Sequence, residues 1–142
     1  MDNILKSKLF VVEDDTFNNL VYLKHLKNLG FENVSTFESG IECLDHLIEK
    51  PDIILLDYQM EHLNGFETLK KIKRFDPSTF IIIISGQTSI DVAIASLKYG
   101  AFDYIKKGDG DLAKISSALM RIAVLKGEKE KTKPSFLTKI FN

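Results

Sequence analysis

The sequence has little of several features that would assign it to particular classes of protein. Its single cysteine, Cys43, has no disulfide partner and no C-x-x-C neighbour that could form a metal or redox pair. This usage is typical of a reducing, intracellular compartment, and we expect Cys43 to be a packing residue. Charge of one sign is not in excess, because 19 lysines and arginines stand against 20 aspartates and glutamates. We therefore predict no nucleic acid partner for this domain.

Long hydrophobic runs are absent as well. The longest purely apolar run, residues 80–84, is far too short to cross a bilayer. The sequence starts with Met1, Asp2 and Asn3 rather than with a basic segment followed by an apolar one, so no signal peptide is expected. These features predict a soluble, cytoplasmic protein without a membrane partner.

The 142 residues, of which 44% are hydrophobic, are enough for one compact domain with a buried core. Five short apolar segments have the composition of strands. Several are rich in Ile and Val and do not alternate with polar residues, which is typical of strands covered on both faces in a parallel sheet. The five segments are residues 9–12, 34–37, 53–56, 80–84 and 102–105.

A helical pattern follows each of these segments. The clearest one has apolar residues at the i, i+3, i+4, i+7 spacing and ends at Gly100, a residue suited to a helix C-terminus. Residues 16–29 are also predicted to form a helix, closed by Gly30. The apolar residues expected on buried helix faces are Phe17, Leu20, Leu23 and Leu26; Ile41, Leu44 and Ile48; Phe66, Leu69 and Ile72; Ile90, Ala93, Ile94 and Leu97; and Leu112, Ile115, Leu119 and Ile122.

Strict alternation of strands and helices predicts a doubly wound α/β domain of five βα units. Its sheet should be parallel, with right-handed crossovers and helices on both faces. The flavodoxin-like strand order 2-1-3-4-5 is the expected arrangement. We place this domain at residues 8–126. We interpret residues 127–142, a polar stretch followed by a short amphipathic segment, as a flexible tail or the remnant of a linker.

Residues able to carry chemistry follow four of the five predicted strands, at the edge where such sheets bind ligands. They are Glu13, Asp14 and Asp15 after the first strand, Asp57 closing the third, Ser85 after the fourth and Lys107 after the fifth. The first and third strands are neighbours in the expected order, so the acids after the first strand should face Asp57. Converging carboxylates repel one another unless a cation lies among them.

The predicted cation is magnesium. An all-oxygen set of ligands, with no histidine or cysteine nearby and with sites left for water and phosphate, favours Mg²⁺ over Ca²⁺. We expect the ligands to be Glu13, Asp14, Asp57 and the backbone carbonyl of Gln59.

Asp57 is also the candidate nucleophile. A carboxylate can attack phosphorus to give an acyl phosphate, and a metal ion offsets the charge repulsion. The Ser85 hydroxyl and the Lys107 ammonium could hydrogen-bond the phosphoryl oxygens as charge moves onto them. Taken singly, these residues have ordinary explanations, such as helix capping or a solvated surface lysine. Their coincidence at one edge is what predicts phosphoryl transfer.

Over about residues 8–126 the chain resembles the receiver domains of two-component response regulators. The resemblance is carried by Leu-Phe-Val-Val-Glu-Asp-Asp at 9–15, Ile-Ile-Leu-Leu-Asp-Tyr-Gln-Met at 53–60 with Asn64 and Gly65, Ile-Ile-Ile-Ser-Gly at 82–86, and Gly-Ala-Phe-Asp-Tyr-Ile-Lys-Lys at 100–107. It implies that Asp57 is the phosphoacceptor, Glu13 and Asp14 the acidic pair for magnesium, Ser85 the switch hydroxyl, Tyr104 the switch aromatic and Lys107 the family's lysine.

The resemblance also implies a function. A receiver takes its phosphoryl group from a sensor histidine kinase or a histidine phosphotransfer protein and catalyses only its own phosphorylation and dephosphorylation. Phosphorylation then changes which downstream effector protein binds to the face of its fourth helix and fifth strand. Whether phosphorylation also produces a homodimer is an open alternative. Asn18, Asn19 and Tyr22 are expected to be exposed and to select the partner. Gln59 and Gln87 are expected to tune the lifetime of the phosphoryl group.

Two departures from the family pattern keep alternatives open. Glu61 and Gly108 stand where many members have proline. The lack of a proline at residue 108, directly after Lys107, is expected to make the loop that carries Lys107 looser. One alternative is a degenerate receiver that only binds partners, and another is the excised receiver of a longer transcription regulator. A haloacid dehalogenase type of enzyme is disfavoured because Gln59 stands where it needs a second aspartate. A flavodoxin is disfavoured because acids after the first strand would repel a phosphate.

Overall fold

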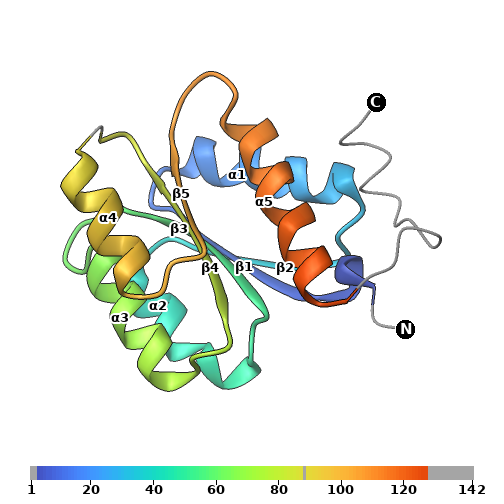
Figure 1. Ribbon diagram of the computed structural model, residues 1–142, viewed down its shortest axis with the longest axis horizontal. Coiled ribbons are helices and arrows are strands. Elements are labelled where there is room, and N and C mark those ends of the chain that lie inside the picture. The colour runs from blue at the N-terminus through green and yellow to red at the C-terminus, as the bar shows by residue number, and fades with distance from the viewer. Residues whose placement is uncertain (1–2, 88, 128–142) are drawn as a thin grey trace.

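Five parallel strands form the centre of the computed structural model, which describes residues 3–87 and 89–127 (Figure 1). The strands are β1 (Lys8–Val12), β2 (Asn33–Phe37), β3 (Ile53–Asp57), β4 (Phe80–Ser85) and β5 (Asp103–Lys106). Their order is β2-β1-β3-β4-β5, and every neighbouring pair is parallel. The predicted fold and strand order are confirmed, and each predicted strand begins and ends within one residue of the observed one.

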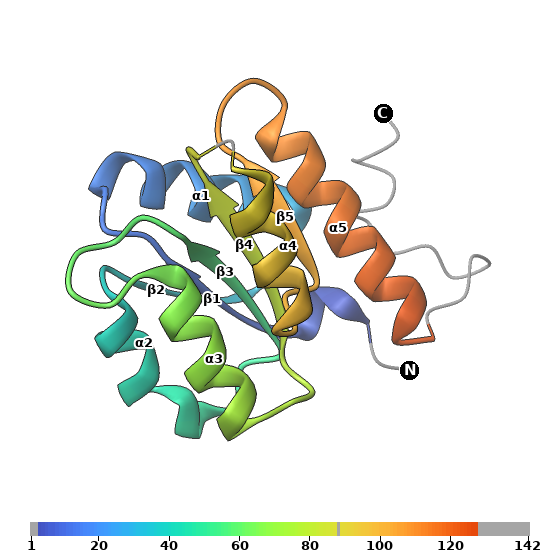
Figure 2. The same cartoon turned by 60° about the vertical axis from the view of Figure 1, so that its left-hand side comes forward.

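Helices cover both faces of this sheet (Figure 2). On one face lie α1 (Thr16–Leu29) and α5 (Asp111–Leu125), and on the other lie α2 (Gly40–Asp45), α3 (Gly65–Phe75) and α4 (Ile90–Lys98). Two short 3-10 helices, Ile4–Lys6 and Leu47–Glu49, precede β1 and β3. The helices α1 and α5 are joined by a 2.8 Å hydrogen bond between His25 Nε2 and Ser116 Oγ.

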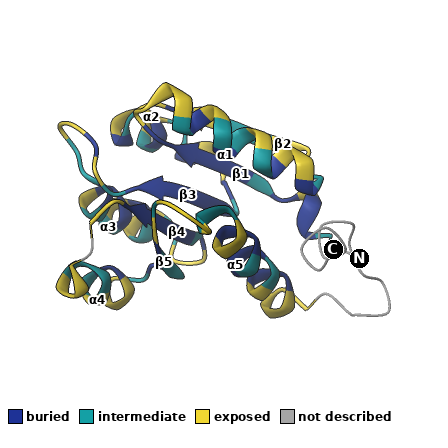
Figure 3. Cartoon of the chain, turned by 90° about the horizontal axis from the view of Figure 1, so that it is seen from above, coloured by how far each residue is buried: buried dark blue, intermediate teal, exposed yellow. Residues whose placement is uncertain are grey.

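The sheet is buried between these two layers (Figure 3). Successive residues of a strand point to opposite faces. Ile53 and Leu55 of β3 therefore pack with α1 and α5, whereas Ile54 and Leu56 pack with α2 and α3. Because both faces need apolar residues, the strands are continuous apolar runs rather than alternating ones. Cys43 is buried in the layer of α2 and α3, in line with the packing role predicted for it.

The buried face of α1 agrees with the one predicted from apolar spacing only at Leu26. Its buried residues are Asn19, Tyr22, Leu26 and Leu29. Phe17 and Leu20, which were expected to face the core, are 73% and 58% exposed. Apolar residues lie around much of this helix, so spacing alone could not select a face. The prediction that Asn19 and Tyr22 are exposed residues that select a partner is therefore wrong.

The apolar face predicted for α4 is wrong too. Ile90, Ile94 and Leu97 are 72%, 51% and 48% exposed, and Ser96 is the buried residue of this helix. The neighbouring strand β5 has only four residues and lies at the edge of the sheet, so it offers α4 little apolar surface.

Of the other three predicted faces, those of α3 and α5 are mostly buried, whereas that of α2 is largely exposed. The α3 residues Leu69 and Ile72 are buried, and so are three of the four predicted residues of α5: Ile115, Leu119 and Ile122. On the short helix α2, however, the predicted residue Ile41 is exposed, and Ile48 beyond it is exposed as well. A helix of six residues beside the edge strand β2 has room to bury little more than Cys43.

Two further predictions concern the membrane and the C-terminal segment. Across residues 3–87 and 89–127, no helix combines the length and the apolar character that a bilayer crossing requires. The predicted tail, residues 127–142, lies outside the described residues except for Gly127. The domain boundary at residue 126 stays a prediction.

Candidate functional site

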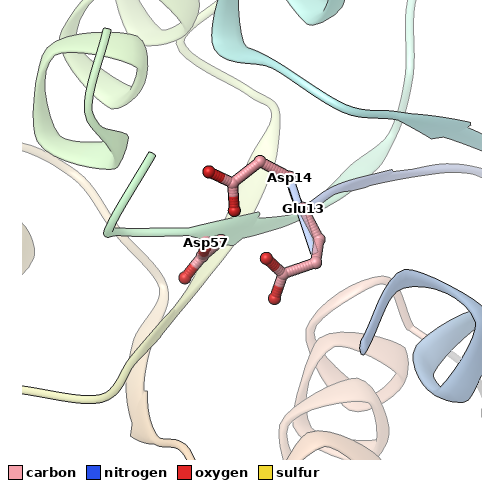
Figure 4. Close-up of side chains that lie close together, drawn as sticks. All are labelled: Glu13, Asp14 and Asp57. Atoms are coloured by element: carbon pink, nitrogen blue, oxygen red, sulfur yellow. The ribbon is translucent and has the colours of Figure 1, made fainter. Parts of the chain in front are cut away.

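Glu13, Asp14 and Asp57 bring their carboxylates together at the carboxyl ends of β1 and β3 (Figure 4). One carboxylate oxygen from each residue lies within 4.8 Å of the other two. The strands pair in parallel with Val12 opposite Leu56, so the residues that follow these two positions leave the sheet side by side. The structure thus gathers three of the four acids that the sequence placed at this edge, whereas the side chain of Asp15 caps α1.

Lys107, the residue directly after β5, joins this acidic cluster. Its Nζ lies 2.9 Å from Glu13 Oε1 and 3.0 Å from Asp57 Oδ1. Both carboxylates are almost fully buried, with 1% exposure for Glu13 and 3% for Asp57. The backbone N–H of Lys107 donates to Ser85 O at 2.8 Å, which ties the end of β5 to the end of β4. These contacts form with Gly108 next in the chain, and the predicted looseness of this loop stays a prediction.

The second oxygen of Asp57 has no such partner. Oδ2 is buried and accepts no hydrogen bond from the residues that the structure describes. Its companion Oδ1 has Lys107 and a long 3.4 Å contact from the Gln59 backbone N–H. A buried acceptor left unpaired costs roughly 1–3 kcal/mol, so this oxygen is suited to a cation or to an electrophile. Three oxygen ligands around it fit a hard divalent ion such as Mg²⁺.

The charges at this edge do not balance. Burial raises the pKa of Glu13, and a hydrogen bond shared with Asp57 raises it further. Asp14 is exposed, but partial desolvation and a hydrogen bond with Glu13 still raise its pKa. For Lys107, burial acts to lower the pKa, but hydrogen bonds with Glu13 and Asp57 outweigh it and leave the pKa raised. One ammonium group faces three carboxylates, which leaves room for a second cation.

The raised pKa values predict an unusual pH dependence of stability. A carboxyl with a higher pKa in the folded protein binds its proton more readily there than in the unfolded chain. The free energy of unfolding should therefore rise as the pH falls from neutral through the raised pKa values toward the ordinary values, 4.5 for Glu13 and 3.8 for Asp14. Urea unfolding in metal-free buffer at about pH 7 and about pH 5 measures this slope.

The control for this experiment is Glu13→Gln, which should show a flatter dependence because one of the two groups is gone. Saturating Mg²⁺ should also remove the gain at low pH, since a metal ion holds its carboxylate ligands ionised. If the stability of wild type and of Glu13→Gln changed equally with pH, the idea that the raised pKa of Glu13 causes this dependence would be contradicted.

Ser85 and Tyr104 lie on the two strands beyond Asp57. The register pairs Asp57 with Ile84, so Ser85 is the next residue along β4, and it is fully buried. Its Oγ accepts a 3.0 Å hydrogen bond from the backbone N–H of Gln87. Tyr104 packs on the α2 and α3 side, and its buried hydroxyl finds no hydrogen-bond partner in the described part of the chain.

The loop after β3 folds back tightly on Asp57. The N–H of Gly65 donates to Tyr58 O at 2.8 Å, and Asn64 caps α3 through its side chain. A Cβ at Gly65 would lie 2.5 Å from Asp57 O, a contact that no side chain can make. The absence of a side chain at residue 65 thus lets α3 begin directly against the nucleophile candidate.

Asn19, which was expected to be exposed, is buried against the backbone of this site. Its Nδ2 donates to Glu13 O at 3.0 Å and to Phe37 O at 3.1 Å. A signal for its burial was present, because Asn19 stands three residues before Tyr22 and seven before Leu26, on the face that α1 buries. The competing spacing of Phe17 and Leu20 hid that signal.

This fold and this edge together define a class of protein: a doubly wound α/β domain that gathers carboxylates and a lysine at the switch point of its sheet. The family model of the response regulator receiver domain matches residues 9–119. The chain belongs to the response regulator receiver family, whose members are phosphoacceptor switches of two-component systems. Receiver domains bind Mg²⁺ at an acidic cluster, which here corresponds to Glu13, Asp14 and Asp57.

Curated relatives and solved structures agree with this assignment. The chain is 36% identical over 100 residues to the transcriptional regulatory protein ZraR of Klebsiella oxytoca and to the DNA-binding transcriptional regulator NtrC of Escherichia coli K12. These matches cover 70% of the chain but only 22% and 21% of the relatives. The chain thus spans about a fifth of the length of these regulators.

Among solved structures, a receiver domain protein of Clostridium thermocellum superposes with a TM-score of 0.77 at 28% identity, covering 84% of this chain and 96% of that one. The CheX-CheY-BeF3-Mg²⁺ complex of Borrelia burgdorferi gives a TM-score of 0.75 at 25% identity, covering 82% of this chain and 88% of that one.

Proposed function

We propose that this chain is a phosphorylation switch that accepts a phosphoryl group on Asp57 in a magnesium-dependent reaction. The donor is a sensor histidine kinase or a histidine phosphotransfer protein. The observation that carries the proposal is the buried, unpartnered Oδ2 of Asp57, set among two further carboxylates and one lysine.

In this proposal each residue at the edge has one task. Asp57 forms the new P–O bond while the P–N bond to the donor's imidazole breaks. Lys107 holds Asp57 Oδ1 and neutralises charge that gathers on the phosphoryl oxygens. The Ser85 hydroxyl donates a hydrogen bond to one of those oxygens and is the switch hydroxyl.

Glu13 and Asp14, with Asp57 and the backbone carbonyl of Gln59, would hold the magnesium ion. When bound, the ion supplies positive charge that offsets the repulsion between the carboxylate and the incoming phosphoryl group. Gln59 and Gln87, both exposed beside the site, would influence how long the phosphoryl group survives.

The output surface in this proposal is the face of α4 and β5, which binds a downstream effector protein. Two observations support it. Ile90, Ile94 and Leu97 are exposed there and leave an apolar surface without a partner in the chain as described. Tyr104 lies beside this face with a buried hydroxyl that lacks a partner, so another position with a hydrated hydroxyl is close in energy. Movement of Tyr104 would reshape the face.

The test is incubation with acetyl phosphate, with and without Mg²⁺, followed by measurement of the intact mass. The expected result is one phosphoryl adduct that requires Mg²⁺. It should be absent from Asp57→Asn, which keeps the shape of the side chain but cannot form an acyl phosphate. An adduct that persists in Asp57→Asn would show that another residue is modified.

The degenerate receiver predicts a different outcome. It would give no adduct, and it would also bind no beryllofluoride with Mg²⁺, since both ligands need the same site. A functional receiver that hydrolyses its acyl phosphate quickly would give no adduct either, but it would form a stable beryllofluoride complex. The solved CheX-CheY complex of Borrelia burgdorferi contains beryllofluoride together with Mg²⁺.

A further inference from the structure

Asn19 is a polar residue in a place where α1 otherwise buries apolar side chains. It is 7% exposed and lies one turn before Tyr22. A buried amide that fails to form hydrogen bonds costs free energy, and Asn has two protons to donate. Both are used: Nδ2 donates to Glu13 O at 3.0 Å and to Phe37 O at 3.1 Å.

These two acceptors belong to the ends of two neighbouring strands. Phe37 is the last residue of β2, and Glu13 follows the last residue of β1. Phe37 O also accepts a 3.0 Å hydrogen bond from the Glu13 backbone N–H. The backbone of Glu13 is therefore held through its N–H by β2 and through its carbonyl by α1, at the point where the chain leaves the sheet.

This clamp acts on the segment that carries two of the three carboxylates. The side chains of Glu13 and Asp14 extend from the peptide unit whose carbonyl Asn19 binds, and both converge on Asp57. Groups that orient metal ligands from behind typically contribute about 10-fold to 100-fold to metal affinity.

We infer that Asn19 is a positioning residue for the magnesium site, acting through the backbone of Glu13. This inference rests on the proposed function, because it assigns Asn19 a part in binding the ion at that site. A purely structural role makes a different prediction: the loss of Asn19 would lower stability and leave the affinity for Mg²⁺ unchanged.

The experiment compares Asn19→Leu with Asn18→Leu. The two positions are adjacent on α1, and the Asn18 contact that the structure records is made by its backbone N–H, to Asp15 Oδ1. Mg²⁺ is titrated into each variant of the 142-residue chain by calorimetry, and the rate of phosphorylation by acetyl phosphate is measured at increasing Mg²⁺. We expect Asn19→Leu to raise the Kd for Mg²⁺ by about tenfold. Its rate at saturating Mg²⁺ should return to the wild-type value, and Asn18→Leu should match wild type throughout.

Three results would speak against this. An unchanged Kd in Asn19→Leu would overturn the inference, whatever its melting temperature. A rate that stays low at saturating Mg²⁺ would overturn it as well, because that result indicates general damage to the site. Wild-type protein that binds no Mg²⁺ would instead refute the proposed function. If Asn19→Leu does not fold, Asn19→Ser decides by the same Kd, since serine is small enough to fit and too short to reach both carbonyls.

Discussion

Replacing Lys107 by methionine is expected to slow phosphorylation of Asp57 by about a hundredfold or more, the typical loss when a preorganised group that stabilises developing charge is removed. Methionine keeps the length of the side chain but loses its charge. Lys107 Nζ lies 2.9 Å from Glu13 Oε1 and 3.0 Å from Asp57 Oδ1, and no second cation contacts either carboxylate within the described residues. The rate with acetyl phosphate at saturating Mg²⁺ measures this effect.

The same substitution should destabilise the metal-free protein. It leaves two buried carboxylates without a counter-charge, and breaking such a pair costs about 3–5 kcal/mol. Because the side chain of Lys107 is 22% exposed, we expect the lower figure of about 2–3 kcal/mol in urea unfolding at neutral pH. Mg²⁺ should restore part of this loss, since it supplies the missing positive charge.

Lys106→Met is the matched control. Lys106 is the preceding residue, and its side chain is exposed. This variant removes the same charge one residue earlier in the chain and should behave like wild type in both measurements. Equal effects of the two substitutions would mean that net charge, rather than the contacts of Lys107, is responsible.

Replacing Asp14 by asparagine is expected to have opposite effects on metal binding and on metal-free stability. The substitution removes a full negative charge from the carboxylate cluster while keeping a side-chain oxygen. Because even indirect partners of a metal ligand contribute about 10-fold to 100-fold, loss of this carboxylate should weaken the Kd for Mg²⁺ by about a hundredfold or more. Calorimetric titration with Mg²⁺ measures this loss.

Without metal, Asp14→Asn should be more stable than wild type at neutral pH. Partial desolvation and the hydrogen bond with Glu13 raise the pKa of Asp14, so its ionised form is disfavoured in the folded protein. Asp15→Asn provides the control. Asp15 carries the same charge one residue later, and its side chain caps α1 by accepting from the Asn18 N–H, a task that asparagine performs equally well. A metal-free Asp14→Asn variant no more stable than this control would contradict the idea of repulsion within the cluster.

The amino-acid sequence by itself determined the order of the elements and the edge where chemistry gathers. Continuous Ile and Val runs identify strands buried on both faces, and the helical stretches between them require parallel crossovers. All five strands were located within one residue. Glu13, Asp57, Ser85 and Lys107 could be placed at one edge because parallel strands all end there, whatever the details of packing.

Only the tertiary structure decided which face each helix buries. On α1 the spacing of Phe17 and Leu20 competes with that of Asn19 and Tyr22, and both describe a plausible stripe. On α4 the stripe of Ile90 and Ile94 is regular, yet it faces outward. A periodic pattern shows that a helix has an apolar side, but the surface available on the neighbouring strands determines whether that side is covered. The edge strand β5, with only four residues, offers little apolar surface to cover that side of α4.

The tertiary structure also decided the contacts that join distant parts of the chain at the site. Lys107 meets Glu13 and Asp57 across the sheet, and Asn19 joins the backbone of Glu13 to that of Phe37. The sequence could name the charged members of the site, because three carboxylates near one another imply a cation. It could not predict the role of Asn19, because every residue has a backbone carbonyl. The residue types at positions 13 and 37 therefore do not indicate that their carbonyls accept a hydrogen bond from Asn19.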